Sequence, residues 1–232
     1  MKQRILLKLS GEALMGEQNF GIDGQVCQKI AADLALLHQQ GIQIALVIGG
    51  GNIFRGARLP LERTPADQMG MLATVMNGIA LQRTLIAQGL PVRVMSAFAC
   101  GSFVELYSWQ NAIAALENQE IVLFVGGTGQ PYFTTDTAAA LRAVEIDADI
   151  LLKATQVDGI YTEDPKRNPK AIKFDMLTYT QVLSKQLQVM DLTAITICRE
   201  NQMPIRVFDL FAEQSLQRAV ANEPIGTLVE GT

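Results

Sequence analysis

The sequence predicts an α/β fold, a three-layer α/β/α sandwich with a mostly parallel central sheet. Short apolar runs alternate in regular order with segments of helical periodicity. The runs are continuously apolar rather than alternating, which is typical of strands that helices cover on both faces. Hydrophobic residues make up 49% of the 232 residues, enough for a full core. Because no repeat or linker interrupts the chain, we expect one domain over residues 1–232.

Six apolar runs are candidate strands. They cover residues 4–9, 43–48, 91–96, 121–125, 149–154 and 204–208. Parallel strands need crossover connections, so the segments between these runs should be helices that return the chain across the sheet.

The first of these helices is expected to begin after the N-cap residue Asp23 and to end at Gly41. One face of it is apolar, formed by Val26, Ile30, Leu34 and Leu37. Further helices are expected over about 67–88, 106–118, 135–147, 178–187, 190–202 and 213–221. The polar stretch 155–173 is long for a connection, and such loops are often functional.

Charge and residue usage exclude several classes of function. The net charge of −4 gives no basic excess for nucleic acid or an anionic membrane surface, and no apolar run approaches the ~20 residues that span a bilayer. The three cysteines are far apart without a C-x-x-C pair, which favours a reducing compartment and a cytoplasmic protein. The one histidine, His38, lies near a predicted helix end. A histidine-based triad or a histidine-rich metal site is therefore not expected, and no individual residue is assigned as a metal ligand.

Glycine-rich loops follow four of the predicted strands, at the sheet edge where such folds bind ligands. They read "LSGEALMG", "GGGNIFRG", "GGTGQPYFTTD" and "TQVDGIYTEDP". None is a dinucleotide fingerprint, and Glu17 stands where a Walker A loop needs lysine. Backbone N–H groups of glycine turns can nonetheless cradle phosphate, since no Cβ holds it off. One Gly-Gly pair by itself would suit a plain strand-to-helix turn without a ligand. Two such glycine-rich turns, at residues 49–51 and 126–129, together favour phosphate binding.

Isolated charges accompany these loops. Lys8, inside an apolar strand, is either a snorkelling edge residue or a charge aimed into a site. Arg55 is either a surface arginine or a fork that binds phosphate oxygens. Each of Asp136, Asp164 and Asp191 alone suits a helix cap or a turn. Together they could hold magnesium or fix lysines beside a polyphosphate.

Taken together, these segments resemble the bacterial UMP kinase (uridylate kinase) family of the amino-acid-kinase superfamily. The resemblance covers essentially the whole chain and rests on "KLSGEAL", "VIGGGNIFRG", "DQMGMLATVMNG", "TGQPYFTTDTAAALRA", "LLKATQVDGIYTEDP" and "VMDLTA". It implies an amino-acid-kinase-like fold and ATP-dependent phosphorylation of UMP to UDP, with Mg²⁺, in pyrimidine nucleotide biosynthesis. It also implies a homohexamer, activation by GTP and inhibition by UTP.

The resemblance also implies roles for individual residues. Catalysis would involve Lys8, Arg55 and Asp191, with Asp136 as a charge organiser. The UMP side would lie mainly in 1–135 and the ATP side mainly in 150–232. ATP would contact Lys8, Leu9, Ser10, Gly11, Gly51, Arg55, Thr155, Tyr161 and Asp164. UMP would contact Gly50, Asp67, Thr128, Gly129, Gln130, Pro131, Tyr132, Phe133, Thr134 and Thr135. GTP activation would involve Gly16, Glu17, Gln18, Asn19, Phe20 and Gly21.

The chain departs from the family pattern at several positions. Gln68 stands for a histidine, Gln130 for an asparagine and Tyr132 for a phenylalanine, and the segment 57–66 is unlike its counterpart. The methionines of "MGMLATVM" suit either a helix core or a subunit interface.

Two other kinds of function stay open beside UMP phosphorylation. Related kinases of the superfamily phosphorylate carboxylates or carbamate, but the hydroxyls of "TGQPYFTT" with Asp67 favour a nucleoside monophosphate. A nucleotide-binding sensor or storage protein on the same scaffold would lack turnover.

Overall fold

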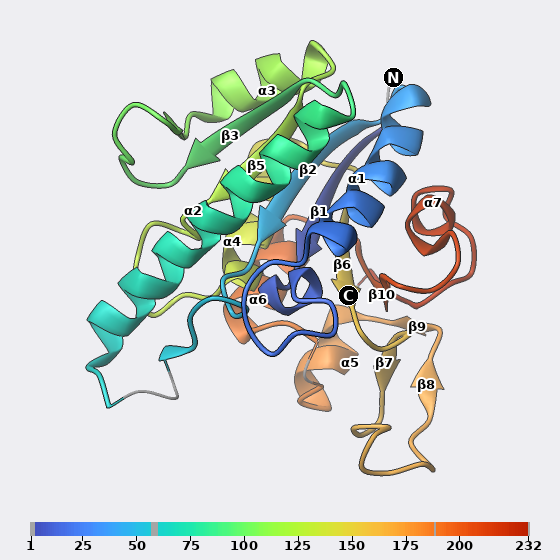
Figure 1. Ribbon diagram of the computed structural model, residues 1–232. Helices are drawn as coiled ribbons and strands as arrows, with labels where there is room; N and C mark the ends of the chain where they lie inside the picture. The colour runs from blue at the N-terminus through green and yellow to red at the C-terminus, as the bar shows by residue number, and fades with distance from the viewer. Residues whose placement is uncertain (1–2, 57–59, 188, 232) are drawn as a thin grey trace.

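The computed structural model describes residues 3–56, 60–187 and 189–231 (Figure 1). A nine-stranded sheet forms its centre, in the order β4-β3-β5-β2-β1-β6-β10-β11-β9. The six predicted strands are all present within one or two residues of their expected bounds. They are β1 (Arg4–Leu9), β2 (Gln43–Ile48), β3 (Val92–Ser96), β5 (Ile121–Val125), β6 (Ile150–Thr155) and β10 (Ile205–Asp209).

Five short strands were not predicted. Three of them extend the edges of the sheet: β4 (Glu105–Leu106), β9 (Met176–Leu177) and β11 (Thr227–Val229), the last antiparallel to β10. The other two, β7 (Ile160–Tyr161) and β8 (Lys173–Phe174), pair as an antiparallel hairpin inside the polar stretch expected to be a loop. Strands of two or three residues carry too little periodicity to be recognised from sequence.

All seven predicted helices are present, and a 3₁₀ helix, η1 (Gly11–Leu14), follows β1. The α-helices are α1 (Gly24–Gln39), α2 (Arg63–Ala87), α3 (Trp109–Glu117), α4 (Thr135–Glu145), α5 (Tyr179–Ser184), α6 (Leu192–Glu200) and α7 (Ser215–Val220).

Two of these helices begin more than two residues from the expected position. Helix α2 begins at Arg63 rather than at residue 67, since Pro65 is tolerated in a first turn. Helix α3 begins after the N-cap Ser108 rather than at 106, because residues 105–106 pair as β4. The unusual segment 57–66 thus ends inside α2, while its residues 57–59 lie outside the described residues.

Helices cover both faces of the sheet (Figure 1). Helices α1, α2 and α7 pack on one face, around a core that includes Leu7, Leu46 and Phe208. Helices α3, α4, α5 and α6 pack on the other, around Leu6 and Leu151. The three-layer α/β/α prediction is therefore confirmed. Within the described residues, none of the helices is long and apolar enough to cross a membrane.

Strand β1 lies in the middle of the sheet, parallel to β2 on one side and to β6 on the other. The edge-strand interpretation of Lys8 is therefore wrong. Lys8 is the cross-strand partner of Lys153, so both side chains leave the sheet on the face covered by α4 and α6. Because β5, β2, β1 and β6 are adjacent and parallel, the glycine-rich loops that follow them lie side by side.

Candidate active site

Two lysines, Lys8 buried and Lys153 partly buried, flank one carboxylate at the centre of this edge. Lys8 Nζ lies 2.7 Å from Asp136 Oδ1, and Lys153 Nζ lies 2.8 Å from Asp136 Oδ2. Lys153 also donates a hydrogen bond to the carbonyl of Val189. The lysines come from adjacent strands and Asp136 from the first turn of α4. Sequence reasoning missed Lys153, although "ILLK" at 150–153 repeats "ILLK" at 5–8.

The charges of this cluster depend on one another. Burial raises the pKa of Asp136, but the ammonium groups of Lys8 and Lys153 outweigh burial and hold that pKa below its ordinary value. Burial lowers the pKa of Lys153, and the attraction of Asp136 opposes that decrease. Two ammonium groups against one carboxylate leave a positive excess in a site of low exposure. Such a site stabilises an anion strongly, because few water molecules screen the charges.

Asp191 caps a helix and does not pair with Lys8. It caps α6 by accepting a hydrogen bond from the Ala194 N–H at 2.9 Å. It also accepts from the hydroxyls of Thr137, at 2.8 Å, and of Thr134. Thr134 in turn accepts from the Asp136 N–H at 3.0 Å. The carboxylate that pairs with Lys8 is thus that of Asp136. The Asp191 carboxylate is joined through the Thr134 hydroxyl to the backbone N–H of Asp136.

The glycine turn after β2 is tightly enclosed by the protein itself. A Cβ on Gly49 would lie 2.8 Å from the Gly11 nitrogen, and one on Gly50 would lie 2.7 Å from the Gly70 carbonyl oxygen. At Gly51 the nearest atoms would be those of Glu12, at 3.8 Å. Packing against the start of η1 and against α2 therefore explains the first two glycines. At Gly51 alone of the three does packing leave room for an approaching ligand.

Arg55 lies over this turn. Its Nη2 is 2.6 Å from Glu12 Oε1, and its Nε donates to the Gly51 carbonyl at 2.9 Å. Both side chains are partly exposed, so the ion pair can open to admit an anion. Sequence reasoning missed Glu12, which comes from η1 and meets Arg55 only in the folded chain.

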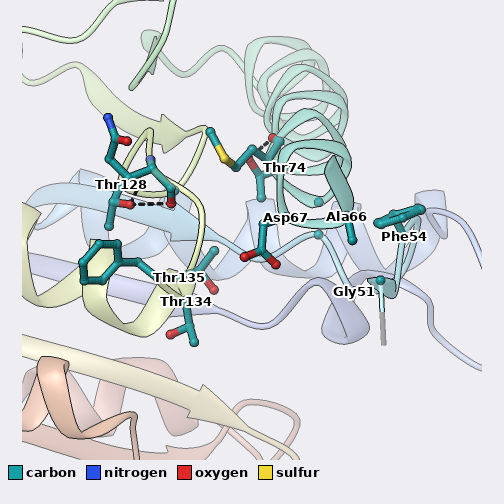
Figure 2. Close-up of a pocket in the computed structure, with 15 residues that line it drawn as sticks. Gly51, Phe54, Ala66, Asp67, Thr74, Thr128, Thr134 and Thr135 are labelled. Atoms are coloured by element: carbon teal, nitrogen blue, oxygen red, sulfur yellow. Dashed lines mark hydrogen bonds between the residues drawn. The ribbon is translucent and has the colours of Figure 1, made fainter. Parts of the chain in front are cut away.

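A cavity of about 200 Å³ opens beside the turn, between α2 and the start of α4. Figure 2 shows Asp67 on α2 facing Thr134 and Thr135 across it. Eight predicted acceptor or donor residues line it: Gly50, Gly51, Asp67, Thr128, Gln130, Phe133, Thr134 and Thr135. The lining also contains Gly127, from the predicted phosphate-binding turn 126–129. The remaining lining residues had no predicted contact with a ligand; they are Phe54, Gly56, Ala66, Gly70, Met71 and Thr74. Gly129, Pro131 and Tyr132 belong to the same loop but lie outside this lining.

The carboxylate of Asp67 holds the 128–135 loop against α2. Its Oδ2 accepts from the Tyr132 N–H at 2.7 Å and lies 3.5 Å from Arg63 Nε. The Arg63 guanidinium also stacks on the Tyr132 ring, 4.7 Å from its centroid. Tyr132 has a φ of +72°, an unusual conformation for a residue with a Cβ. These contacts stabilise it, and they connect the two walls of the cavity.

A larger cavity, of about 690 Å³, lies between β6, the β7–β8 hairpin and the segment after α5. Three predicted ATP residues line it, namely Thr155, Tyr161 and Asp164, and so does Lys153. The Tyr161 hydroxyl donates to Asp158 Oδ1 at 2.6 Å, and this hydrogen bond contributes most to lowering the pKa of Asp158. The hairpin that sequence reasoning missed thus forms one wall of the cavity. The remaining lining is Val157, Gly159, Ile160, Thr162, Glu163, Pro165, Arg167, Lys185, Gln186, Leu187, Val189 and Val207.

The other predicted residues lie on the glycine-turn side. Leu9 is fully buried in the core, so only its backbone could meet a ligand. Ser10 caps η1 by accepting from the Glu12 N–H at 3.3 Å. The segment 16–21 follows η1 and ends at Gly21, whose N–H donates to the Asn52 carbonyl at 2.9 Å. It therefore lies against the glycine turn, with Phe20 exposed.

Residues 3–209 match the amino acid kinase family. The chain belongs to this family. Its curated relatives include a uridylate kinase of Protochlamydia amoebophila, 54% identical over 98% of this chain and 93% of the relative. Another is a uridylate kinase of Bacteroides thetaiotaomicron, 52% identical over 98% of each chain.

Solved structures of the family match the whole fold as well. The UMP kinase from Ureaplasma parvum superposes with a TM-score of 0.93, at 36% identity over 100% of both chains. The UMP kinase from Bacillus anthracis superposes with a TM-score of 0.94, at 37% identity over 98% of this chain and 96% of that one. The sheet and both of its helical layers are therefore shared with solved structures over nearly the whole chain.

Proposed function

We propose that this amino acid kinase transfers the γ-phosphoryl group of ATP to UMP, giving UDP and ADP in pyrimidine nucleotide biosynthesis. The uridylate kinases and UMP kinases that it resembles along nearly its full length support this substrate. The observation that carries the proposal is the Lys8–Asp136–Lys153 cluster, which borders both cavities. Lys153 lines the larger one, and Thr135, next to Asp136, lines the smaller.

The two cavities are lined by different parts of the chain, which supports one binding side for each substrate. The smaller cavity is lined by residues between 50 and 135, and we assign it to UMP. The larger is lined by residues between 153 and 207, and we assign it to the nucleoside of ATP. We infer an acceptor side mainly in 1–135 and an ATP side mainly in 150–232, within one domain. Leu9, Ser10 and Gly11 would meet the ATP phosphates through their backbone.

The proposed reaction is a direct in-line transfer. An oxygen of the UMP phosphate attacks the γ-phosphorus, a new O–P bond forms, and the bond to the β-phosphate oxygen breaks so that ADP carries away the electron pair. No general base is needed, because a phosphate monoester is mostly ionised at neutral pH. Lys8, Arg55 and the N-terminus of α4 neutralise charge on the transferred group, and the residues that line the two cavities hold the reactants in line.

Magnesium fits this site as a companion of ATP rather than as a resident ion. Within the described residues, no group of three or more histidine, cysteine or acidic side chains is placed to hold a metal. Mg²⁺ commonly binds through substrate phosphates with one or two carboxylates and water molecules. Asp136 and Asp191, whose helix starts are joined through the Thr134 hydroxyl, are the carboxylates that would complete its shell. Bound there, Mg²⁺ would neutralise part of the phosphate charge.

The test is turnover of the purified protein with ATP and Mg²⁺. UMP, dUMP, CMP, acetylglutamate, aspartate and carbamate are offered separately, and ADP formation is followed. We expect turnover with UMP far above that with the carboxylates and carbamate. Tight UMP binding without any ADP formation would replace the proposal with the sensor or storage function.

Asp67 is proposed to receive the ribose hydroxyls of UMP, since an ionised carboxylate only accepts hydrogen bonds. Replacing it in Asp67→Asn should raise KM for UMP about tenfold or more, because a hydrogen bond to a charged group contributes roughly 1.5–3 kcal/mol. KM for ATP should stay unchanged. The matched variant Asp164→Asn, in the larger cavity, should show the reverse pattern. An unchanged KM for UMP in Asp67→Asn would remove Asp67 from the ribose site.

We also propose a homohexamer in the cytoplasm, activated by GTP through the segment 16–21 and inhibited by UTP. The exposed apolar side of α2 supports assembly. Met69 is 43% exposed, Leu72 53% and Met76 56%, at a helical spacing that forms one stripe. For Met69 and Met76, this exposure favours a place in a subunit interface over a place in a helix core. Turnover measured with added GTP and with added UTP tests the two regulators.

Charge introduced into this stripe tests the assembly. The double variant Leu72→Glu, Met76→Glu should shift the mass of the particle in solution from a hexamer to smaller species, because unpaired carboxylates would be buried at the interface. Gln25→Glu with Gln28→Glu adds the same charge on exposed positions of α1 and should leave the mass unchanged. A hexamer that persists in both double variants would show that α2 does not mediate assembly.

A further inference from the structure

Two asparagine side chains form a reciprocal pair between the glycine turn and α2. Asn52 Nδ2 donates to Asn77 Oδ1 at 2.8 Å, and Asn77 Nδ2 donates to Asn52 Oδ1 at 2.7 Å. Asn52 is 2% exposed and Asn77 is fully buried. A buried amide destabilises the fold unless its N–H and C=O groups make hydrogen bonds. Each asparagine here supplies a partner to the other, so the two side chains are fixed relative to each other.

The second proton of each amide reaches a different segment. Asn77 Nδ2 donates to the Gly49 carbonyl at 2.7 Å, and Asn52 Nδ2 donates to the Gly21 carbonyl at 3.0 Å. All four N–H donors of the pair are therefore used. The pair ties three segments together, namely the middle of α2, the glycine turn and the end of the 16–21 segment.

The pair also sets how closely the turn approaches the first loop. A Cβ on Gly11 would lie 2.5 Å from Asn52 Oδ1 and 2.8 Å from the Gly51 nitrogen. The start of η1 thus packs both against the backbone of the turn and against the Asn52 amide. Any shift of this amide would move Gly51, the glycine of the turn that packing leaves open toward a ligand.

We propose that Asn52 and Asn77 are positioning residues that hold the Gly49–Gly51 turn where it receives phosphate, and that they link the 16–21 segment to that turn. The inference rests on the proposed function, because it assigns the turn to nucleotide phosphate. Neither amide is proposed to touch substrate. Displacements near 1 Å can lower a rate about 10²-fold, so a residue behind the turn can matter as much as one within it.

The experiment separates positioning of phosphate from general stability. Asn77→Ala removes the bonds to Gly49 and Asn52, and Asn77→Asp keeps the shape but cannot donate. UMP affinity is measured by calorimetry and uridine affinity by displacement of UMP, each at a temperature where the variant is folded. Tyr179→Phe is the matched control, since the Tyr179 hydroxyl makes a buried hydrogen bond to the Met203 carbonyl beneath α5.

We expect both Asn77 variants to lose about tenfold in UMP affinity with uridine affinity unchanged, and to lose up to about 10²-fold in kcat. Tyr179→Phe should lower stability without altering the ratio of the two affinities. Equal losses for UMP and uridine, or no loss for either, would overturn the inference while wild-type turnover stands. Should the wild type bind UMP without turnover, the proposed function fails, yet the affinity ratio still tests the positioning role.

Discussion

Lys8→Met should lower kcat for UMP phosphorylation by about 10²- to 10³-fold, the loss typical of removing one group that stabilises transition-state charge. KM for UMP should change little, because Lys8 lies behind the cavity lining, paired with Asp136 at 2.7 Å. Charge on the transferred group grows most in the transition state, so the missing ammonium should affect kcat first.

Steady-state kinetics with UMP and ATP varied separately measure both constants. Lys29→Met, on the exposed side of α1, removes the same charge away from the site and serves as the control. Thermal unfolding should show that Lys8→Met still folds, since Asp136 keeps Lys153 as a partner. Equal and modest changes of kcat and KM would contradict a transition-state role for Lys8.

Asp136→Asn should destabilise the fold by about 3–5 kcal/mol at pH 7, the usual cost of leaving buried charge without its partner. Lys8 and Lys153 would then face each other across a neutral amide. Activity should fall as well, because the lysines lose the group that orients them. Urea unfolding measures the free energy, and Asp175→Asn, at an exposed position, is the control.

The pH dependence of this difference follows from the lowered pKa of Asp136. A depressed carboxyl pKa adds stability that is fully present above the ordinary value of 3.8 and is lost as the pH falls through the folded-state pKa. The gap between wild type and Asp136→Asn should therefore narrow as the pH falls below 3.8. Burial already lowers the pKa of Lys153, so the variant should regain stability as the pH rises and a lysine discharges. A gap that stays constant from neutral to acid pH would show that the Asp136 carboxylate contributes no charge-dependent stability.

Much of the fold could be predicted from local pattern. Continuous apolar runs identified the six long strands, and the capping residue Asp23 located the start of the first helix. The short edge strands could not be found, because two or three residues show no period. The β7–β8 hairpin is held by pairing between Ile160 and Phe174, a contact that no local signal announces.

The candidate site, like the fold, could be predicted from the sequence only in part. Sequence alone indicated that glycine turns, Lys8 and several aspartates belong to one phosphate-handling edge, since loops after adjacent parallel strands must converge. It could not tell which aspartate meets Lys8, because Asp136 and Asp191 both begin helices and read alike. Packing of α4 against the sheet brought Asp136 to Lys8, and packing of α6 on α4 turned Asp191 toward Thr137.

The sequence by itself thus determined the class of fold, the order of its long elements and the kind of chemistry at their ends. These depend on period, composition and backbone freedom, which are local properties. Only the tertiary structure decided the Lys8–Asp136–Lys153 cluster, the Arg55–Glu12 pair and the Asn52–Asn77 pair. Each joins residues far apart in the chain, so its distances follow from how helices and strands pack rather than from the residues beside it.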